Sequence, residues 1–461
     1  MYQSFRERIA IFVNSLFYPV LIALLAFFCW LLSTQFGWIP LLFYIVLCFL
    51  PLFSSDGRGY LPLLLFSLII TDKDIHFKGG IPYTMILSIS FFFLSVILYI
   101  IIHKPGMVKG KLFYPLLILF SIFLISYFYC VASKRIFGST GILYLIGFFC
   151  ILVVYVLINS TLGKEDTLPY YCMSLCSISV AAALEVSVTL LQESILDFAS
   201  PSFTLGWSYT RETVSTFLML SIPFFSILIH RKKVGWFIPE LFVFINLILL
   251  STDSGLLSLM LFAIPYILFT LKDFSRHSPY YVMFTLLAIG IVFGILMGVN
   301  VSFNERIVRA VTRLNFFSDE TINFYRPATK NFLDNPVLGS SMQSLVKDNG
   351  TLTLANNTLL TTAELGGSFG LVAFVYYEFR QYQLVLNKDS AEKWFLFLFL
   401  LNVDWIGLID NTIYNIAILL ILVTAMSTYQ QSNRPDDLLI HEDFYQDFDR
   451  EYNSLRNQHI I

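Results

Sequence analysis

The chain has 461 residues, of which 57% are hydrophobic, 17% aromatic and only 13% charged, and its mean hydropathy is +0.73. Soluble domains carry about 25% charged residues, so too few polar side chains remain to cover a water-exposed protein of this size. The 29 basic and 31 acidic residues nearly cancel, which gives no support to a nucleic-acid partner. Fibrous, disordered and secreted classes are excluded, and the composition predicts an all-α polytopic membrane protein.

Apolar runs that can cross a bilayer follow one another along the chain. A spanning helix needs about 20 apolar residues. The candidates lie at approximately 11–35, 38–53, 59–71, 82–102, 112–131, 141–159, 168–193, 211–229, 235–251, 255–271, 279–299, 358–378, 393–409 and 411–429. Because the second and third runs are short and alternatively form one re-entrant hairpin, we expect about 12–14 transmembrane helices.

Basic residues between these runs orient the chain. Lys and Arg accumulate in short cytoplasmic loops, and counting alternate runs puts four basic clusters on one side together with Arg6 and Arg8. The clusters are Lys104/Lys109/Lys111, Arg231/Lys232/Lys233, Lys272/Arg276 and Arg380/Lys388/Lys393. Lys134 and Arg135 fall on the other side. We therefore expect both termini to be cytoplasmic.

This orientation divides the chain into four regions. Residues 1–299 form an N-terminal transmembrane bundle, and residues 300–357 form one long outer loop with short amphipathic helices. Residues 358–429 form the C-terminal transmembrane helices, and residues 430–461 form an acidic cytoplasmic tail. Connections longer than about 12–15 residues are usually functional or disordered, and the outer loop is rich in aromatic residues, so we expect it to be functional.

Arginines follow helical spacing at the start of the outer loop. Arg306, Arg309 and Arg313 share one helix stripe, with apolar residues on the opposite face. One interpretation is an interfacial helix whose arginines touch lipid headgroups. The other is an anion clamp, because guanidinium groups bind phosphate oxygens in pairs.

Further polar residues lie at the outer ends of the predicted helices. Glu364 lies about two turns into its helix, where a carboxylate is costly and is functional or paired with an Arg. Gly366, Gly367 and Gly370 follow it, and the simplest account of them is close helix packing. Other polar residues predicted near this side are Arg211, Asp253, Arg326, Lys330, Asp404 and Asp410, the last two flanking the final outer turn, whereas Glu185 is expected nearer mid-span.

The six cysteines, Cys29, Cys48, Cys130, Cys150, Cys172 and Cys176, all lie in apolar runs. None has neighbours with zinc-like spacing, so we expect buried hydrophobic residues rather than metal or redox sites. Asp72 and Asp74 form an Asp-x-Asp pattern, but so short a pattern in a polar loop gives little reason to expect a metal site.

The stretch Ala355-Asn356-Asn357-Thr358-Leu359-Leu360-Thr361-Thr362-Ala363-Glu364-Leu365-Gly366 resembles the signature of the O-antigen ligase and Wzy polysaccharide polymerase superfamily. That signature reads His-Asn, a Leu, then Ala-Glu-x-Gly after a long outer loop. Residues 328–339, which end in Asn-Pro-Val-Leu-Gly, are similar to the family's preceding segment, and residues 206–223 with Arg211 look like an earlier outer segment. The turn at residues 251–255 resembles the family's Ser-Arg-Gly without its Arg. Ala355 stands where the family has His.

The resemblance implies a metal-independent, inverting glycosyltransferase that uses no cofactor and works at the outer face of a bacterial cytoplasmic membrane. Its donor and acceptor are glycans on undecaprenyl diphosphate, and its implied partners are a flippase, a chain-length regulator and membrane lipid. The resemblance gives Glu364, Asn356 and Asn357 the acceptor side of the reaction. The candidate diphosphate-binding residues are Arg211, Arg306, Arg309, Arg313 and Arg326.

The leading hypothesis is a polymerase of surface or capsular polysaccharide repeat units. One alternative is ligase-type transfer of a finished glycan to another acceptor, although the missing His favours the polymerase. The other is a lipid-linked oligosaccharide flippase or transporter, which should concentrate its ionisable residues near the bilayer midplane.

Overall fold

The computed structural model describes residues 5–32, 38–69, 83–133, 139–162, 167–192, 211–231, 234–250, 252–273, 278–299, 319–340, 357–388, 392–408 and 414–432, together with residues 304, 305, 307, 308, 311 and 390. All regular structure in these ranges is helical. The first half contains α1 (Phe5–Val13), α2 (Phe17–Leu31), α3 (Trp38–Phe49), α4 (Tyr60–Ile69), α5 (Tyr83–His103), α6 (Phe113–Ala132), α7 (Ser139–Thr161) and α8 (Leu168–Gln192). The second half contains α9 (Arg211–His230), α10 (Phe237–Leu250), α11 (Asp253–Asp273), α12 (Ser278–Val299), α14 (Asp319–Asp334), α15 (Thr358–Leu386), α16 (Lys393–Gly407) and α17 (Ile416–Ser432).

The helices have the length and composition of a membrane protein. Five described helices are long and apolar enough to cross a bilayer, or six if α1 and α2 form one bent span, and six further apolar helices have 10–17 residues. The all-α polytopic membrane class predicted from the composition is therefore confirmed. Many of the predicted runs form helices shorter than the 20 residues assumed for them.

Two of the expected spans differ from the helices of the structure. The single run expected at 11–35 is two helices, α1 and α2, bent by 70°. Pro19 lies in the first turn of α2, where its missing N–H is tolerated. The runs at 38–53 and 59–71 form α3 and α4, which are joined by short 3-10 turns over residues 50–53 and 57–59. With ten residues, α4 is only about 15 Å long, half the thickness of a hydrocarbon core.

The helix ends that carry basic residues meet at one end of the bundle. The backbone N–H of Lys111 donates to Gln430 Oε1 over 2.9 Å, Lys388 Nζ donates to the carbonyl of Tyr429 over 2.5 Å, and Arg231 forms an ion pair with Glu392 over 2.7 Å. We call this the basic end. The predicted shared side of these three basic clusters is confirmed, and its identity as the cytoplasmic side stays a prediction.

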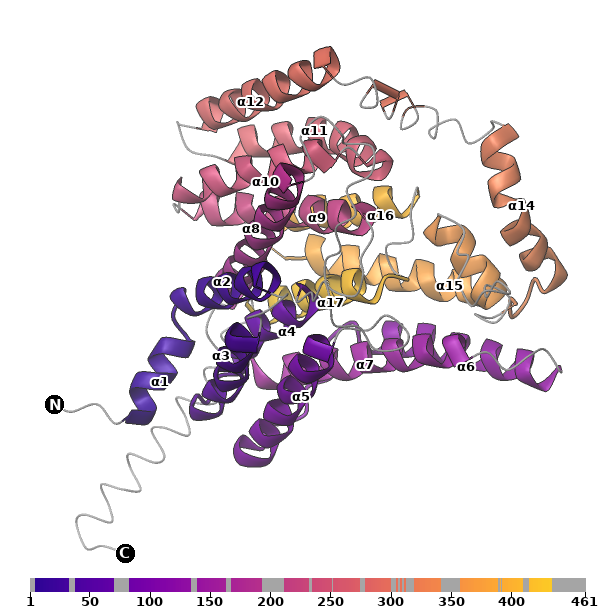
Figure 1. Cartoon of the computed structure of the whole chain (residues 1–461). Helices are drawn as coiled ribbons and strands as arrows, with labels where there is room; N and C mark the ends of the chain where they lie inside the picture. Colours follow the sequence, from indigo (N-terminus) through magenta and orange to yellow (C-terminus); the bar gives the residue numbers. More distant parts are fainter. Residues whose placement is uncertain are drawn as a thin grey trace, which may run out of the picture.

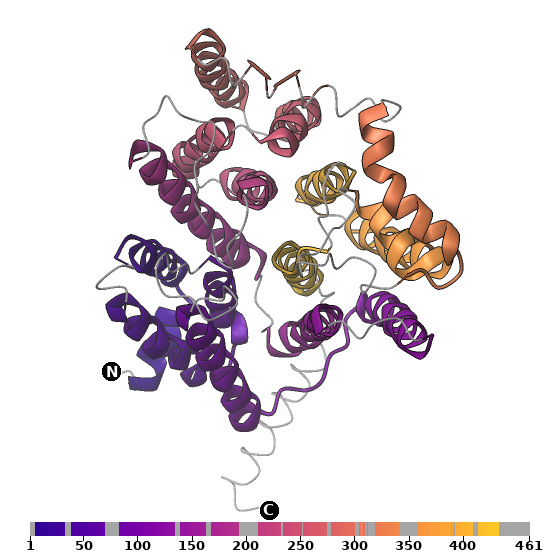
Figure 2. The same ribbon diagram turned by 45° about the vertical axis from the view of Figure 1, so that its right-hand side comes forward.

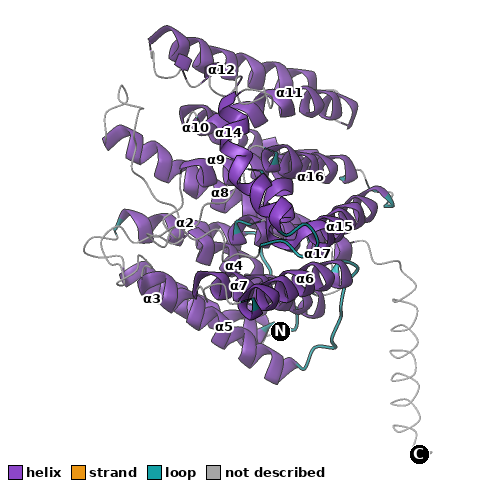
Figure 3. Ribbon diagram, turned by 90° about the vertical axis from the view of Figure 1, so that its right-hand side faces the viewer, coloured by secondary structure: helices purple, strands orange, loops and turns teal. Residues whose placement is uncertain are grey.

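The opposite end, which we call the loop end, carries α14 and the loop of residues 335–340. α14 lies on the far side of the molecule from α1 (Figure 1) and packs along α15 (Figure 2). Viewed from the loop end, α14 lies in front of the helical bundle (Figure 3). The loop end is therefore where part of the predicted outer segment meets the membrane helices.

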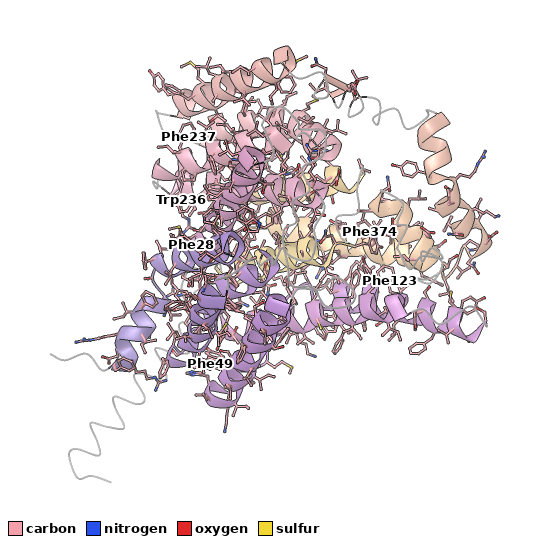
Figure 4. The ribbon with its side chains drawn as sticks, viewed as in Figure 1. Phe28, Phe49, Phe123, Trp236, Phe237 and Phe374 are labelled. Carbon is pink, nitrogen blue, oxygen red and sulfur yellow. The ribbon has the colours of Figure 1, made fainter. Side chains whose placement is uncertain are left out.

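α6 and α15 run antiparallel and form the wall behind this junction. Phe123 of α6 and Phe374 of α15, both buried, are labelled in Figure 4 where these helices lie side by side. A Cβ on Gly366 would lie 3.1 Å from the Phe123 ring, and one on Gly370 would lie 3.8 Å from it. The predicted packing role of these two glycines is therefore confirmed.

Five cysteines are buried as predicted, whereas Cys150 is exposed on the surface of α7. An apolar position in a membrane helix can face lipid as readily as protein. The hydrophobic run therefore does not show which cysteines are buried and which are exposed.

Candidate functional site

A break in α15 forms the centre of the loop end. Gly367 has φ +63° and ψ −154°, which interrupts the helical backbone. The groups freed by this break bond to the preceding loop: Ser368 N donates to the carbonyl of Pro336 over 2.8 Å, and Phe369 N donates to that of Val337 over 3.4 Å. The Asn-Pro-Val-Leu-Gly segment thus docks into a broken membrane helix and satisfies its backbone.

Glu364 lies one turn before the break and is 2% exposed. Its Oε1 accepts a hydrogen bond of 2.5 Å from Asn331 Nδ2 of α14. Its Oε2 is buried, and no atom of the described residues hydrogen-bonds to it. A buried carboxylate oxygen without a donor is costly, so this oxygen is the natural acceptor for a ligand or water proton.

The position of Asn331 is fixed by a small hydrogen-bond network. Ser340 Oγ donates to the carbonyl of Asn331 over 2.8 Å and accepts from Asn335 Nδ2 over 3.2 Å. The backbone N–H of Ser340 donates to the carbonyl of Glu364 over 2.7 Å. Both ends of the Asn331–Glu364 contact are therefore held by the same loop.

α6 anchors this junction from the membrane side. Ser126 Oγ donates to the carbonyl of Leu365 over 2.7 Å, and Cys130 Sγ donates to the carbonyl of Ser340 over 3.2 Å. The Leu365 carbonyl lies in the turn before the break. Three elements, α6, α14 and α15, thus position the Glu364 carboxylate.

Asn357 is the N-cap of α15. Its Oδ1 accepts from Leu360 N over 2.9 Å, and its Nδ2 donates to the carbonyl of Leu408 after α16 over 3.0 Å. The side chain therefore starts α15 and ties it to the end of α16. Its predicted part in orienting the acceptor stays a prediction.

Arg211 begins α9, where the sequence places it at a helix end. Its guanidinium donates to the carbonyl of Leu250 at the end of α10. α9 packs against α10, α11 and α16, whereas α15 packs against α6, α14 and α16, so α16 lies between the two predicted residues Arg211 and Glu364. No contact brings these two side chains together among the described residues.

The remaining predicted residues divide between exposed and undescribed positions. Arg326 is exposed on α14. Arg306, Arg309, Arg313 and Asn356 lie outside the described residues, as do Asp72, Asp74 and Asp410. Asp404 lies in the last turn of α16, and Tyr382 of α15 donates to its carboxylate. Its carboxylate therefore faces α15.

Sequence reasoning did not predict Asn331, Ser340 or the break itself. The Asn-Pro-Val-Leu-Gly segment and the Gly366-Gly367 pair were the available signals, but their contact spans about 30 residues of sequence. Among the described residues, no three His, Cys, Asp or Glu side chains lie close enough to hold a metal ion. The junction can offer a hydrogen-bond acceptor, Glu364 Oε2, beside the amide of Asn331.

Compared with known proteins, the chain matches no protein-family model and no curated protein. The resemblance to O-antigen ligases and Wzy polymerases thus stays a prediction from the motif residues. Any functional conclusion depends on the geometry of this chain's own residues.

Proposed function

We propose that this protein polymerises lipid-linked oligosaccharide repeat units into surface polysaccharide at the outer face of a bacterial cytoplasmic membrane. The observation that carries the proposal is the Glu364 carboxylate, which is buried at a helix break with Oε1 held by Asn331 and Oε2 without a donor. Such an oxygen is suited to accept the proton of a sugar hydroxyl.

The proposed reaction needs two kinds of group. The acceptor hydroxyl attacks the anomeric carbon of the donor, the bond from that carbon to the diphosphate breaks with inversion, and the hydroxyl proton moves to Glu364 Oε2. The leaving diphosphate needs positive charge in a water-poor site. We assign this role to the arginines named from the sequence, Arg211, Arg306, Arg309, Arg313 and Arg326.

Access to Glu364 requires movement at the junction, because the carboxylate is 2% exposed. α14 supplies the covering residue Asn331 and packs against α15. We propose that an incoming acceptor displaces α14 and takes over hydrogen bonds that the loop end makes without substrate.

The test is repeat-unit extension by purified protein in detergent, with undecaprenyl diphosphate-linked oligosaccharide as the only substrate. Glu364→Gln keeps the shape and the contact to Asn331 but removes the base, so we expect extension to fall about 10²–10⁴-fold. The matched control is Asp334→Asn, which removes an exposed carboxylate from the same junction. If Glu364→Gln extends repeat units at the wild-type rate, the proposal is wrong.

A second pair of variants tests the diphosphate role. Arg313→Ala and Arg211→Ala each remove one proposed guanidinium, so we expect weaker donor binding and lower extension at equal protein level. If both variants match the wild type in donor dependence, the leaving group is stabilised by other residues. A single transfer to a different acceptor, without a ladder of products, would indicate a ligase.

A transporter of lipid-linked oligosaccharides is the second candidate. The observation in its favour is an acidic pair, Glu378 and Asp404, between α15 and α16, together with a broken helix. Extension in detergent separates the two candidates, because no transport takes place there. A transporter would instead move labelled substrate across vesicle membranes without lengthening it.

A further inference from the structure

Two carboxyl groups meet between α15 and α16, away from the Glu364 junction. The side chains of Glu378 and Asp404 hydrogen-bond to each other. An ionised carboxylate only accepts hydrogen bonds, so this contact requires a proton on one of the two groups. One proton shared by the two groups would satisfy this contact.

The pair lies between the basic end and the loop end. Glu378 is eight residues before the end of α15, and Asp404 is eleven residues after the start of α16. At 1.5 Å per residue, both lie about 12–17 Å from the basic end, and Asp404 lies about 5 Å from the other end of α16. Two negative charges at this depth would be costly.

The surroundings supply hydrogen-bond donors to the pair. Tyr382 donates its hydroxyl to Asp404 Oδ2, and Gln381 Nε2 donates to Glu378 Oε1 over 3.4 Å. Within the described ranges, neither carboxyl forms an ion pair with a Lys or Arg. One shared proton would therefore lower the charge of the pair.

Unpartnered polar atoms lie on the same helix beside the pair. Gln381 is 0% exposed, and its Oε1 has no hydrogen-bond partner among the described residues. The hydroxyl of Tyr377, also 0% exposed and one helical turn from Gln381, has none there either. Buried polar atoms of this kind usually bind water, which would give the pair a source of protons.

Polar side chains continue from these atoms toward the basic end. Tyr377 interacts electrostatically with Tyr155 of α7. The Tyr155 hydroxyl donates to Gln430 Oε1 over 3.1 Å, and the same oxygen accepts from Lys111 N at the basic end. Proton exchange with water would follow these polar groups toward the basic end.

We propose that Glu378 and Asp404 form a membrane-embedded binding site for one exchangeable proton, which holds α15 against α16. Binding transfers a proton from water to a carboxylate oxygen, and no group is oxidised or reduced. Release leaves two like charges in contact, which repel. A hydrogen bond from Asn357 to the carbonyl of Leu408 also joins α15 and α16 at the loop end. Proton occupancy of the pair would therefore also affect the position of Glu364. The proposal holds for either candidate function.

The first test follows the stability of purified protein in detergent between pH 5 and pH 9, with Glu378→Gln as the variant. The native pair keeps a proton that the carboxyls of the unfolded chain release near pH 4, so wild-type stability should fall as pH rises. One proton corresponds to a tenfold change in the folding constant per pH unit. Glu378→Gln removes one of the two carboxyls that share the proton, so the stability of this variant should depend less on pH. The neighbouring titratable groups, Tyr155, Tyr377 and Tyr382, are phenols that keep their protons up to about pH 10.

The second test is infrared spectroscopy of the protein in lipid bilayers at pH 7. We expect a protonated carboxylic acid band in the wild type that weakens in Glu378→Gln and in Asp404→Asn. Glu392→Gln is the matched control, because Glu392 is paired with Arg231 and should leave this band unchanged. Parallel pH profiles for the wild type and Glu378→Gln, or an acid band that neither carboxyl variant changes, would overturn the proposal. If Glu378→Gln does not fold, comparison of the acid band in Asp404→Asn with that of the wild type still tests the proposal.

Discussion

Gly339 and Gly367 lie backbone against backbone, and both have left-handed φ values, +71° and +63°. A Cβ on either residue would lie 2.6 Å from the backbone nitrogen of the other. The break in α15 and the turn after α14 are thus two halves of one contact. Only residues without a Cβ allow the loop to approach the broken helix so closely.

Replacing either glycine should therefore destabilise the loop end. We expect Gly367→Ala to lower the free energy of unfolding by about 2 kcal/mol or more, because about 1–2 kcal/mol of left-handed strain adds to a backbone clash. Gly290→Ala is the matched control, since Gly290 lies within α12 and has open space around it. That variant should be neutral or gain up to about 1 kcal/mol. The measurement is the free energy of unfolding of the wild type, Gly367→Ala and Gly290→Ala in detergent solution. An equal loss of stability in both variants would contradict the packing argument.

Asn331 should be the residue that keeps the Glu364 carboxylate in place. Asn331→Asp puts a second carboxyl 2.5 Å from Oε1, where the amide donor was. We expect a loss of about 1–3 kcal/mol at pH 7, because a buried oxygen loses its donor. At pH 4 the introduced Asp is partly protonated and can donate again, so the loss should shrink. A variant equally stable relative to the wild type at both pH values would show that this hydrogen bond matters little.

The sequence predicts the helices of this protein much better than their breaks. The expected runs at 112–131, 168–193 and 211–229 agree with α6, α8 and α9 to within one residue at each end. Length and hydropathy determine such runs locally. The left-handed Gly367 is different, because its conformation depends on a loop about 30 residues earlier, and a Gly-Gly pair also suits ordinary helix packing.

The candidate site was predicted only in part for the same reason. Glu364 is conspicuous because a carboxylate in an apolar run is rare. Asn331 is an ordinary polar residue of an amphipathic helix, and nothing local indicates that it pairs with Glu364. Glu378 was not singled out, and the contact between Asp404 and Tyr382 was not predicted, since sequence spacing does not reveal which helices are neighbours.

Asn357 offers a way to separate capping from chemistry. Asn357→Ala removes both hydrogen bonds, and we expect a loss of about 0.5–2 kcal/mol. Asn357→Asp keeps an acceptor for Leu360 N but cannot donate to the carbonyl of Leu408, so it should recover most of the capping stability. If repeat-unit extension tracks stability in both variants, Asn357 acts through the helix start. If Asn357→Asp is stable but inactive, the amide takes part in binding the acceptor.

The ion pair of Arg231 and Glu392 should stabilise the basic end modestly. Arg231 Nη2 and Nε both approach Glu392 Oε1, at 2.7 and 2.9 Å. Burial alone would raise the pKa of Glu392, but Arg231 and nearby hydrogen bonds outweigh it and hold the pKa below 4.5. We therefore expect a coupling energy of about 1 kcal/mol in a double-mutant cycle with Arg231→Gln and Glu392→Gln at pH 7.

The pH dependence of this pair has a definite sign. Because the folded-state pKa of Glu392 is the lower one, its contribution is present above the unfolded value and is lost as pH falls through the folded value. Repeating the cycle below pH 4 should therefore reduce the coupling. A coupling that does not change with pH would mean that the variants perturb packing instead of charge.

Lys388 should make the stability of the protein depend on pH in the alkaline range. Burial, with a smaller contribution from the nearby Lys111, lowers the pKa of Lys388 from 10.5 to about 8. Its ammonium donates to the carbonyl of Tyr429 and lies 4.3 Å from the centre of the Tyr429 ring. Between pH 8 and pH 10.5 the unfolded chain keeps the proton that the folded chain has released, so this residue makes stability rise with pH. Lys388→Met should remove that rise while keeping much of the buried stem. Unfolding midpoints of the wild type and Lys388→Met from pH 7 to pH 10 provide the measurement: the wild type should gain relative to the variant, and curves that stay parallel would mean that Lys388 keeps an ordinary ammonium pKa.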